Sequence, residues 1–194
     1  MPISSSARGT PPPPELDRLS DIPSTPKAYW RKASEPMTTM VVVASKHGST
    51  AEIGERIASV LSARGVKAHV KDVGEAGKWL YETDNVVVGM PVYRQKLLGE
   101  GQLFMEAHRT ELAGKPLFLF AVGGGPTLEP RLVDQLRQYP HREVTYFRGA
   151  MDEEKMSFFE KLQLRAAKAP SNADFRDWPA VEDWANGLLA YGVS

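Results

Sequence analysis

The stretch TTMVVVASKHGST, residues 38–50, decides the fold of this chain. Residues 40–44 form a short apolar run rich in β-branched side chains, which predicts a buried strand. A polar turn follows, and the amphipathic segment directly after it predicts the start of a helix. Such a turn offers backbone N–H groups, hydroxyls and the positive end of a helix dipole. These groups suit a bound phosphate.

The turn is built from small and polar residues, namely Ser45, Lys46, His47, Gly48, Ser49 and Thr50. Gly48 allows a close backbone approach or a positive φ. The spacing matches neither the G-x-x-x-x-G-K-[ST] loop nor the G-x-G-x-x-G fingerprint. A helix capped by serine or threonine after any strand gives the same pattern. From the turn alone, a phosphate site and a capped helix both stay open.

The pattern Ser-x-x-Gly-x-Thr after a first strand resembles the FMN-phosphate loop of flavodoxins. This resemblance implies FMN as a noncovalent cofactor, with residues 45–50 around its phosphate. It also implies ligand loops after the third and fourth strands of the sheet, because flavodoxin-like sheets bind ligands at the carboxyl ends of their strands.

The composition limits the possible functions. The chain has 194 residues, with 42% hydrophobic and 25% charged residues, which is typical of one globular domain. It has no cysteine, which excludes disulfides, thiolate metal sites and cysteine nucleophiles. The formal net charge is zero. A large basic surface for nucleic acid is therefore absent, and so is the strong acidity with which many flavodoxins attract basic partners.

Residues 1–37 differ from the rest because serine and proline break every helical or strand period. We predict a disordered or extended tail there and a single domain over residues 38–194. A polyproline ligand for a partner remains an alternative, as does translation from Met37 or Met40. No apolar run is long enough to span a membrane and no signal peptide is visible, so a cytoplasmic location is expected.

Strand and helix patterns alternate along the domain. Strands are predicted at residues 40–44, 66–73, 85–89, 115–122 and 143–148. Helices are predicted at residues 51–64, 102–112, 131–139, 153–168 and 178–189. This alternation predicts an α/β fold, a flavodoxin-like doubly wound sheet of five parallel strands with helices on both faces. Leu103, Phe104 and Ala107 are expected to face the core, and Asp177 and Pro179 to start the last helix.

The loop after the third strand contains Pro91, Val92, Tyr93 and Arg94. A flavin ring is flat and amphipathic, so it needs an aromatic or apolar wall and a few polar groups at its edge. Tyr93 is the best candidate for stacking on the ring, although a loop aromatic packed on its own domain gives the same pattern. The sequence Gly-x-Pro-x-aromatic is similar to the second flavin loop of flavodoxins and flavodoxin-like reductases.

The loop after the fourth strand begins with Gly123, Gly124 and Gly125. Successive glycines permit backbone amides to approach a ligand closely. In flavodoxins the equivalent loop lies against the pyrimidine edge of the flavin, and the resemblance implies that role here. A simple flexible turn remains the alternative.

The resemblance extends over about residues 39–189. The sequences FRGAMD at residues 147–152 and DFRDW at residues 174–178 resemble the C-terminal half of flavodoxin-domain proteins related to quinone-dependent protoporphyrinogen oxidases. In those enzymes FMN oxidises protoporphyrinogen IX and passes the electrons to menaquinone. The resemblance therefore implies an oxidoreductase of this kind. A flavodoxin-type electron carrier and a flavin-free module that kept the fold are the alternatives.

One departure from the family pattern bears on the redox chemistry. Relatives often carry a glycine near N5 of the flavin, whereas residues 91–98 contain none and Gln95 stands in its place. Arg94 and Lys96, if they point inward, favour an anionic reduced flavin and two-electron chemistry. Solvated surface cations are the alternative reading of both residues.

Other chemistries fit the sequence less well. A receiver domain needs acidic residues where this chain has Ala44, Ser45, Gly89 and Met90. The four histidines show no metal-ligand spacing, so no metal site is predicted. The predicted helix 153–168 mixes aromatic and basic residues, which leaves a peripheral membrane contact open beside a core role. The redox partner or quinone and the oligomeric state are unknown from sequence.

Overall fold

The computed structural model describes residues 37–44, 48–97, 99–151 and 173–193. Residues 1–36 of the predicted tail and the whole predicted helix 153–168 lie outside these residues, so both stay predictions. Residues 45–47 of the predicted phosphate turn also lie outside them.

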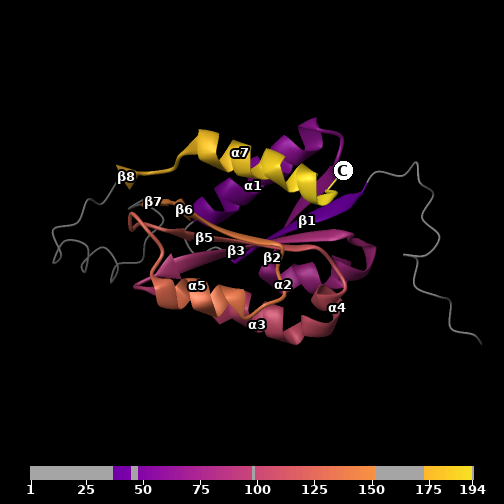
Figure 1. The fold of residues 1–194 in the computed structure, drawn as a ribbon, viewed down its shortest axis with the longest axis horizontal. Helices are drawn as coiled ribbons and strands as arrows, with labels where there is room; N and C mark the ends of the chain where they lie inside the picture. The colour runs from indigo at the N-terminus through magenta and orange to yellow at the C-terminus, as the bar shows by residue number, and fades with distance from the viewer. Residues whose placement is uncertain (1–36, 45–47, 98, 152–172, 194) are drawn as a thin grey trace, which may run out of the picture. The chain divides into compact units, whose positions relative to one another are not determined.

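A parallel sheet forms the centre of the domain (Figure 1). Its strands are β1 Thr38–Val43, β2 Lys67–Asp72, β3 Asn85–Tyr93, β5 Leu117–Gly123 and β6 Glu143–Arg148. They pair in the order β2-β1-β3-β5-β6 and all of these pairs are parallel. A short strand, β4 Lys96–Leu97, adds an antiparallel pair to β3. The predicted flavodoxin-like doubly wound sheet is confirmed.

Helices cover both faces of this sheet, as Figure 1 shows. One face carries α1 Ser49–Ala63 and α7 Trp178–Gly187, which continues into the 3₁₀ helix η5 Leu188–Tyr191. The other face carries α2 Val73–Ala76, the 3₁₀ helix η3 Gly77–Glu82, α3 Gly99–Ala107, α4 Arg109–Ala113 and α5 Pro130–Arg137.

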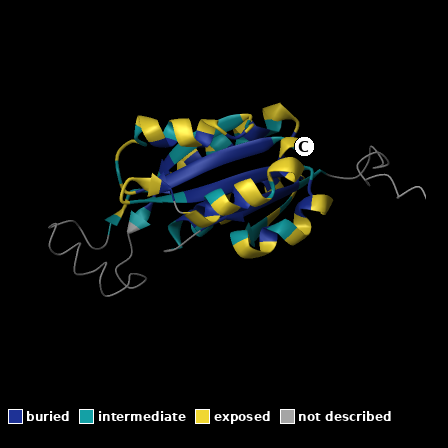
Figure 2. Cartoon of the chain, turned by 90° about the horizontal axis from the view of Figure 1, so that it is seen from below, coloured by how far each residue is buried: buried dark blue, intermediate teal, exposed yellow. Residues whose placement is uncertain are grey.

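Two hydrophobic clusters hold these layers together, one on each face of the sheet. In β5 the side chains alternate, so Phe118 and Phe120 face α1 and α7 while Leu117 and Leu119 face the other helices. A central parallel strand is covered on both faces and is therefore buried along its length, as Figure 2 shows for the dark-blue strands between the helices.

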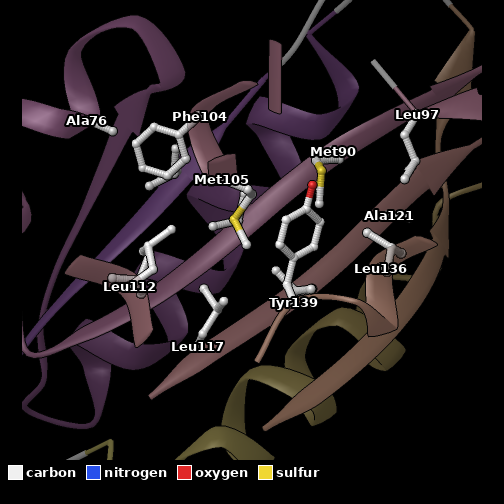
Figure 3. Close-up of a cluster of buried hydrophobic side chains, with 14 of the residues drawn as sticks. Ala76, Met90, Leu97, Phe104, Met105, Leu112, Leu117, Ala121, Leu136 and Tyr139 are labelled. Carbon is white, nitrogen blue, oxygen red and sulfur yellow. The ribbon is translucent and has the colours of Figure 1, made fainter. Parts of the chain in front are cut away.

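The cluster that contains Leu117 and Leu119 lies under α3, α4 and α5. Figure 3 shows Phe104 and Met105 of α3 and Leu112 of α4 gathered with Met90 and Tyr139. All five are buried. Dense apolar packing of this kind anchors α3 directly beside the end of β3, and so it places the segment between them at the carboxyl edge of the sheet.

The predicted single helix 102–112 is wrong in extent and in orientation. The helix starts earlier, at Gly99, and breaks at His108 into α3 and α4. Leu103 is 71% exposed, and Ala107 is exposed as well. Phe104 faces the core as predicted, and Gly101 and Met105 do so in place of Leu103 and Ala107. A Cβ on Gly101 would lie 2.6 Å from Cγ of Met90, so the helix packs too closely for a side chain there.

The start of α7 follows the sequence prediction. The Asp177 carboxylate accepts a hydrogen bond from the Ala180 N–H at 3.1 Å, and Pro179 lies in the first turn. Val181 and Ala185 are buried against the sheet. Within the described ranges, no helix combines the length and apolar character needed to cross a membrane.

Candidate functional site

The carboxyl ends of β1, β3 and β5 meet at one edge of the sheet because the strands are parallel and in register, with Val43 opposite Gly89 and Gly89 opposite Phe120. A cavity of about 150 Å³ opens there between the chain after β3 and the chain after β5. Its lining residues are Val92, Arg94, Gln95, Gly123, Gly124, Gly125, Thr127, Leu128 and Tyr146. Two of the three loops predicted to carry a ligand therefore converge on one cavity.

The predicted end of the third strand at Gly89 is wrong, because β3 continues to Tyr93. The chain then reverses in a two-residue turn at Arg94 and Gln95, so that Tyr93 pairs with Lys96. Both turn residues have positive φ, 49° for Arg94 and 57° for Gln95. Two-residue hairpins need such a backbone to match the twist of the strands, and it usually comes from Asn-Gly or Asp-Gly.

Arg131 at the start of α5 holds this turn in place. Its Nη2 donates a hydrogen bond to the Gln95 carbonyl at 2.7 Å, and its Nε donates to the Glu129 carboxylate at 2.7 Å. A side chain in the left-handed region raises the free energy by about 1–2 kcal/mol per residue, so a hydrogen bond from outside the turn helps to maintain it.

The glycine loop is held by Tyr146. The Tyr146 hydroxyl donates a hydrogen bond to the Gly125 carbonyl at 2.7 Å. A Cβ on Gly123 would lie 3.0 Å from that hydroxyl oxygen and 3.2 Å from Cβ of Val92, so a side chain there would require both neighbours to shift by a few tenths of an ångström. Burial raises the pKa of Tyr146, and the nearby charge of Arg148 opposes the shift.

Pro91 and Tyr93 lie beside the cavity. Pro91 is paired with Val122 in the sheet. Val92 packs against the cluster under α3–α5, so its neighbour Tyr93 points to the opposite face, which carries α1. The guanidinium carbon of Arg94 lies 5.5 Å from the centre of the Tyr93 ring. Stacking of Tyr93 on a flavin ring stays a prediction.

The helix after the first strand begins at Gly48, whose φ is 85°. Gly48 has no side chain, so α1 starts without a side-chain cap hydrogen bond at that position. Ser49 and Thr50 form the first turn, and Thr50 is 2% exposed. A Cβ on Gly149 would lie 2.8 Å from the Ser49 hydroxyl oxygen, so the end of β6 borders this turn. The described part of the turn is a helix N-terminus with two hydroxyl side chains, and phosphate binding there stays a prediction.

A small ribbon extends the same edge of the sheet. It pairs β7 Ala150–Met151 with β8 Ala173–Asp174 in antiparallel fashion. The Phe175 N–H donates to the Gly149 carbonyl at 3.3 Å, and the guanidinium carbon of Arg148 lies 4.1 Å from the Phe175 ring centre. The two sequence stretches FRGAMD and DFRDW thus contact each other. The Nε of Arg148 is buried and has no hydrogen-bond partner among the described residues.

Sequence reasoning missed several residues of the site. Tyr146, Thr127 and Leu128 line the cavity, yet the sequence marks them only as strand and loop residues. Gln95 lines it as well, although the sequence pattern marks that position only as a missing glycine. Tyr146 lies two residues before the end of the predicted strand 143–148, which is expected beside the glycine loop. That position could have identified Tyr146 as a site residue.

The residues present fit FMN. A helix N-terminus with hydroxyl side chains in its first turn suits a phosphate. The cavity combines the apolar Val92 and Leu128 with glycine backbone and one cation, which suits a flat amphipathic ring. The close approach at Gly123 keeps backbone groups, rather than side chains, at the cavity wall.

Solved structures share this fold. Oxidised flavodoxin 2 from Bacillus cereus is 17% identical and has a TM-score of 0.57 over 79% of this chain and 99% of its own. A short-chain flavodoxin associated with a PDU bacterial microcompartment is 17% identical, with a TM-score of 0.55 over 81% and 99%. A mutant of the flavo di-iron protein from Thermotoga maritima is 12% identical, with a TM-score of 0.56 over 82% and 36%. At these identities the likeness concerns the fold.

No curated protein sequence matches this chain. The family model described as "Flavodoxin domain" matches residues 40–176, which include all three strand-end loops and Arg176 at the far end. Family membership implies FMN as the cofactor. On this match and on the sheet order described above, the chain belongs to the flavodoxin-domain family.

Proposed function

We propose that this chain is an FMN-dependent oxidoreductase that transfers two electrons from a reduced substrate to an acceptor of the quinone class. The observation that carries the proposal is the position of Arg94, a cation that lines the cavity on a turn fixed by Arg131. When bound, FMN supplies a ring that accepts and releases electrons, and the protein supplies its position and electrostatics.

Each part of the chain then has its own role. The N-terminus of α1, with Ser49 and Thr50, binds the phosphate through backbone N–H groups and hydroxyls. The backbone of residues 123–125 contacts the polar edge of the ring, and Val92 and Leu128 shield it from water. We assign the Tyr93 ring to the face of the flavin on the α1 side.

The charge in the cavity favours the two-electron reaction. Arg94 lines the cavity and is also exposed to solvent, so its guanidinium lowers the free energy of a reduced, anionic flavin through a Coulomb attraction that water screens. The Gln95 carbonyl is held by the charged Arg131 at 2.7 Å, so a reorientation of this peptide would break a charge-assisted hydrogen bond. A turn peptide that reorients beside the flavin would stabilise the one-electron-reduced flavin. Because this turn stays in one orientation, it gives that state no such stabilisation.

The substrate proposal comes from the resemblance to proteins related to protoporphyrinogen oxidases. In each of the three steps of such a reaction, two electrons and two protons leave the porphyrinogen and end on a quinone, which becomes a quinol. Arg148, at the carboxyl end of β6 with an Nε that lacks a partner among the described residues, supports a substrate that carries carboxylates. We also keep the expectation of a cytoplasmic location.

The test starts from the purified protein loaded with FMN. A reductive titration is expected to give a single two-electron wave, and Arg94→Gln is expected to lower its midpoint potential by about 30 mV, equivalent to a tenfold change in the reduction equilibrium. The matched control is Arg137→Gln, which removes the same charge from the far end of α5 and leaves the potential unchanged. Oxidation of protoporphyrinogen IX with a quinone is then assayed on both variants.

The alternatives predict different results. The fold shared with flavodoxins favours an electron carrier without its own substrate, and such a carrier would give two separate one-electron waves and no turnover. A flavin-free module would bind no FMN at any concentration. Either outcome contradicts the proposal.

A further inference from the structure

The guanidinium of Arg176 joins the ribbon to the first turn of α1. Its Nη1 donates a hydrogen bond to the Glu52 carboxylate, although 124 positions separate the two residues in the sequence. Its Nε and Nη2 donate to the Asp174 carboxylate at 2.8 and 2.6 Å. The guanidinium carbon also lies 4.7 Å from the centre of the Trp178 ring. The side chain is only 13% exposed.

We propose that Arg176, through its ion pair with Glu52, determines selectivity for the phosphorylated cofactor FMN over riboflavin. This inference rests on the binding of a flavin phosphate at the start of α1. Arg176 is a positioning residue in this scheme, because it acts through Glu52 and through its charge.

Glu52 lies in the first turn of α1 together with Ser49 and Thr50. A carboxylate in that turn interacts favourably with the positive end of the helix dipole. A phosphate bound at the same N-terminus uses the same field, and two anions in one turn repel each other. Glu52 is therefore compatible with FMN only if its charge is offset and its carboxylate is directed away from the helix end.

Arg176 supplies the positive charge that offsets Glu52. Its guanidinium, which Asp174 of β8 shares, donates to the Glu52 carboxylate, and we infer that this contact directs the carboxylate away from the helix end. The bidentate contact with Asp174 fixes the plane of the guanidinium, and the adjacent Phe175 N–H is bonded to the Gly149 carbonyl, so the backbone that carries Arg176 is anchored to the sheet. The hydrogen bonds from Arg176 also lower the pKa of Asp174.

A second ion pair, which joins α1 to α7 itself, offers a matched control. Arg56, one turn further along α1, donates a hydrogen bond to Glu182 of α7 at 2.9 Å. That ion pair is exposed on both sides and lies away from the first turn of α1. The variant Arg56→Gln therefore measures how the loss of an ion pair on α1 affects flavin binding when the pair is away from the phosphate.

The experiment compares the dissociation constants of FMN and riboflavin for the full chain. Arg176→Gln is expected to weaken FMN binding about three- to tenfold and to leave riboflavin binding unchanged, because only FMN carries the phosphate. Glu52→Gln is expected to strengthen FMN binding relative to riboflavin by a similar factor. The double variant should recover most of the loss, and higher salt should shrink every one of these differences.

Two results would overturn the proposal. Equal weakening of both ligands by Arg176→Gln, with Arg56→Gln doing the same, would show a purely structural role. An unchanged ratio in Glu52→Gln would also contradict it, and that variant keeps the test valid if Arg176→Gln fails to fold. If the parent protein binds neither ligand, it is the cofactor assignment that fails, whereas binding with an unchanged ratio contradicts only the role of Arg176.

Discussion

The two segments that border the cavity differ in their glycine content and in their backbone conformation. The β3–β4 turn contains no glycine, yet Arg94 and Gln95 both have positive φ. The loop after β5 has three successive glycines, and none of them has a positive φ. The β3–β4 turn thus has a strained, left-handed backbone and carries side chains. The loop after β5 has no positive φ at its glycines and carries no side chains there.

The difference shows what each segment contributes. Gly123 is needed for its lack of a side chain rather than for backbone freedom, because a Cβ there would press on Tyr146 and Val92. The Arg94–Gln95 turn keeps a charge at the cavity at the expense of about 1–2 kcal/mol of conformational strain per residue. The glycine loop provides room for a ligand, and the turn provides charge.

The largest expected effect comes from filling the space at Gly123. Gly123→Ala should lower the free energy of unfolding by about 1–3 kcal/mol and weaken FMN binding, since the Tyr146 hydroxyl must move away from the Gly125 carbonyl. Gly125→Ala is the control, because a Cβ there meets its nearest atom at 3.5 Å. Urea unfolding and FMN titration measure both effects. Equal losses in the two variants would mean that the loop needs rotational freedom instead.

A smaller effect is expected when the strained turn loses its support. Arg131→Gln removes the hydrogen bond to the Gln95 carbonyl and should lower the free energy of unfolding by about 0.5–1 kcal/mol, because the contact is exposed. Amide hydrogen exchange at residues 94–96 should become faster. Arg137→Gln, on the same helix, should leave that exchange unchanged. Unaltered exchange in Arg131→Gln would show that the turn is stable without its partner.

Relief of the backbone strain at Gln95 should slightly increase the free energy of unfolding. Gln95→Gly removes the left-handed penalty at a φ of 57° but adds backbone entropy to the unfolded chain. The net result is expected to be a stabilisation of up to about 1 kcal/mol, measured by thermal or urea unfolding. A loss of stability beyond the measurement error would imply that the Gln95 side chain has a role the turn geometry does not reveal.

The smallest effect concerns alkaline pH. The pKa of Tyr146 in the folded state is raised above its ordinary value of 10.0 by burial. Well below pH 10 the residue is neutral in the folded and the unfolded chain, so it adds no pH dependence. As the pH rises through that value, the unfolded chain loses this proton first, and stability falls. Tyr146→Phe should reduce the steepness of that fall. Parallel pH profiles for the two proteins would rule out the shift.

Much of the fold could be predicted because its signals are local. Residues 40–44 and 86–89 are continuous apolar runs, which are typical of central parallel strands. Asp177 followed by Pro179 marks the start of α7 at the position where the structure has it. Sheet order then followed from the alternation of strands and helices and from the resemblance to flavodoxins.

The details of the site could not be predicted because they depend on distant contacts. Pro91 and the charged residues after it indicate a loop, but pairing of Val92 with Leu97 extends the strand. The Gln95 carbonyl of the turn is bonded to the distant Arg131, and Glu52 is paired with the distant Arg176. The orientation of α3 was missed because Gly101, a residue without a side chain, faces the core.

The β7–β8 ribbon has a consequence for how this protein can change. Ala150 pairs with Asp174 and Met151 with Ala173, so the residues on either side of the stretch 152–172 are held next to each other. A stretch inserted between such ends can be lengthened, shortened or exchanged without a shift of β6 or α7. The paired ends therefore separate changes in the sequence of residues 152–172 from the strands and helices that surround the cofactor site.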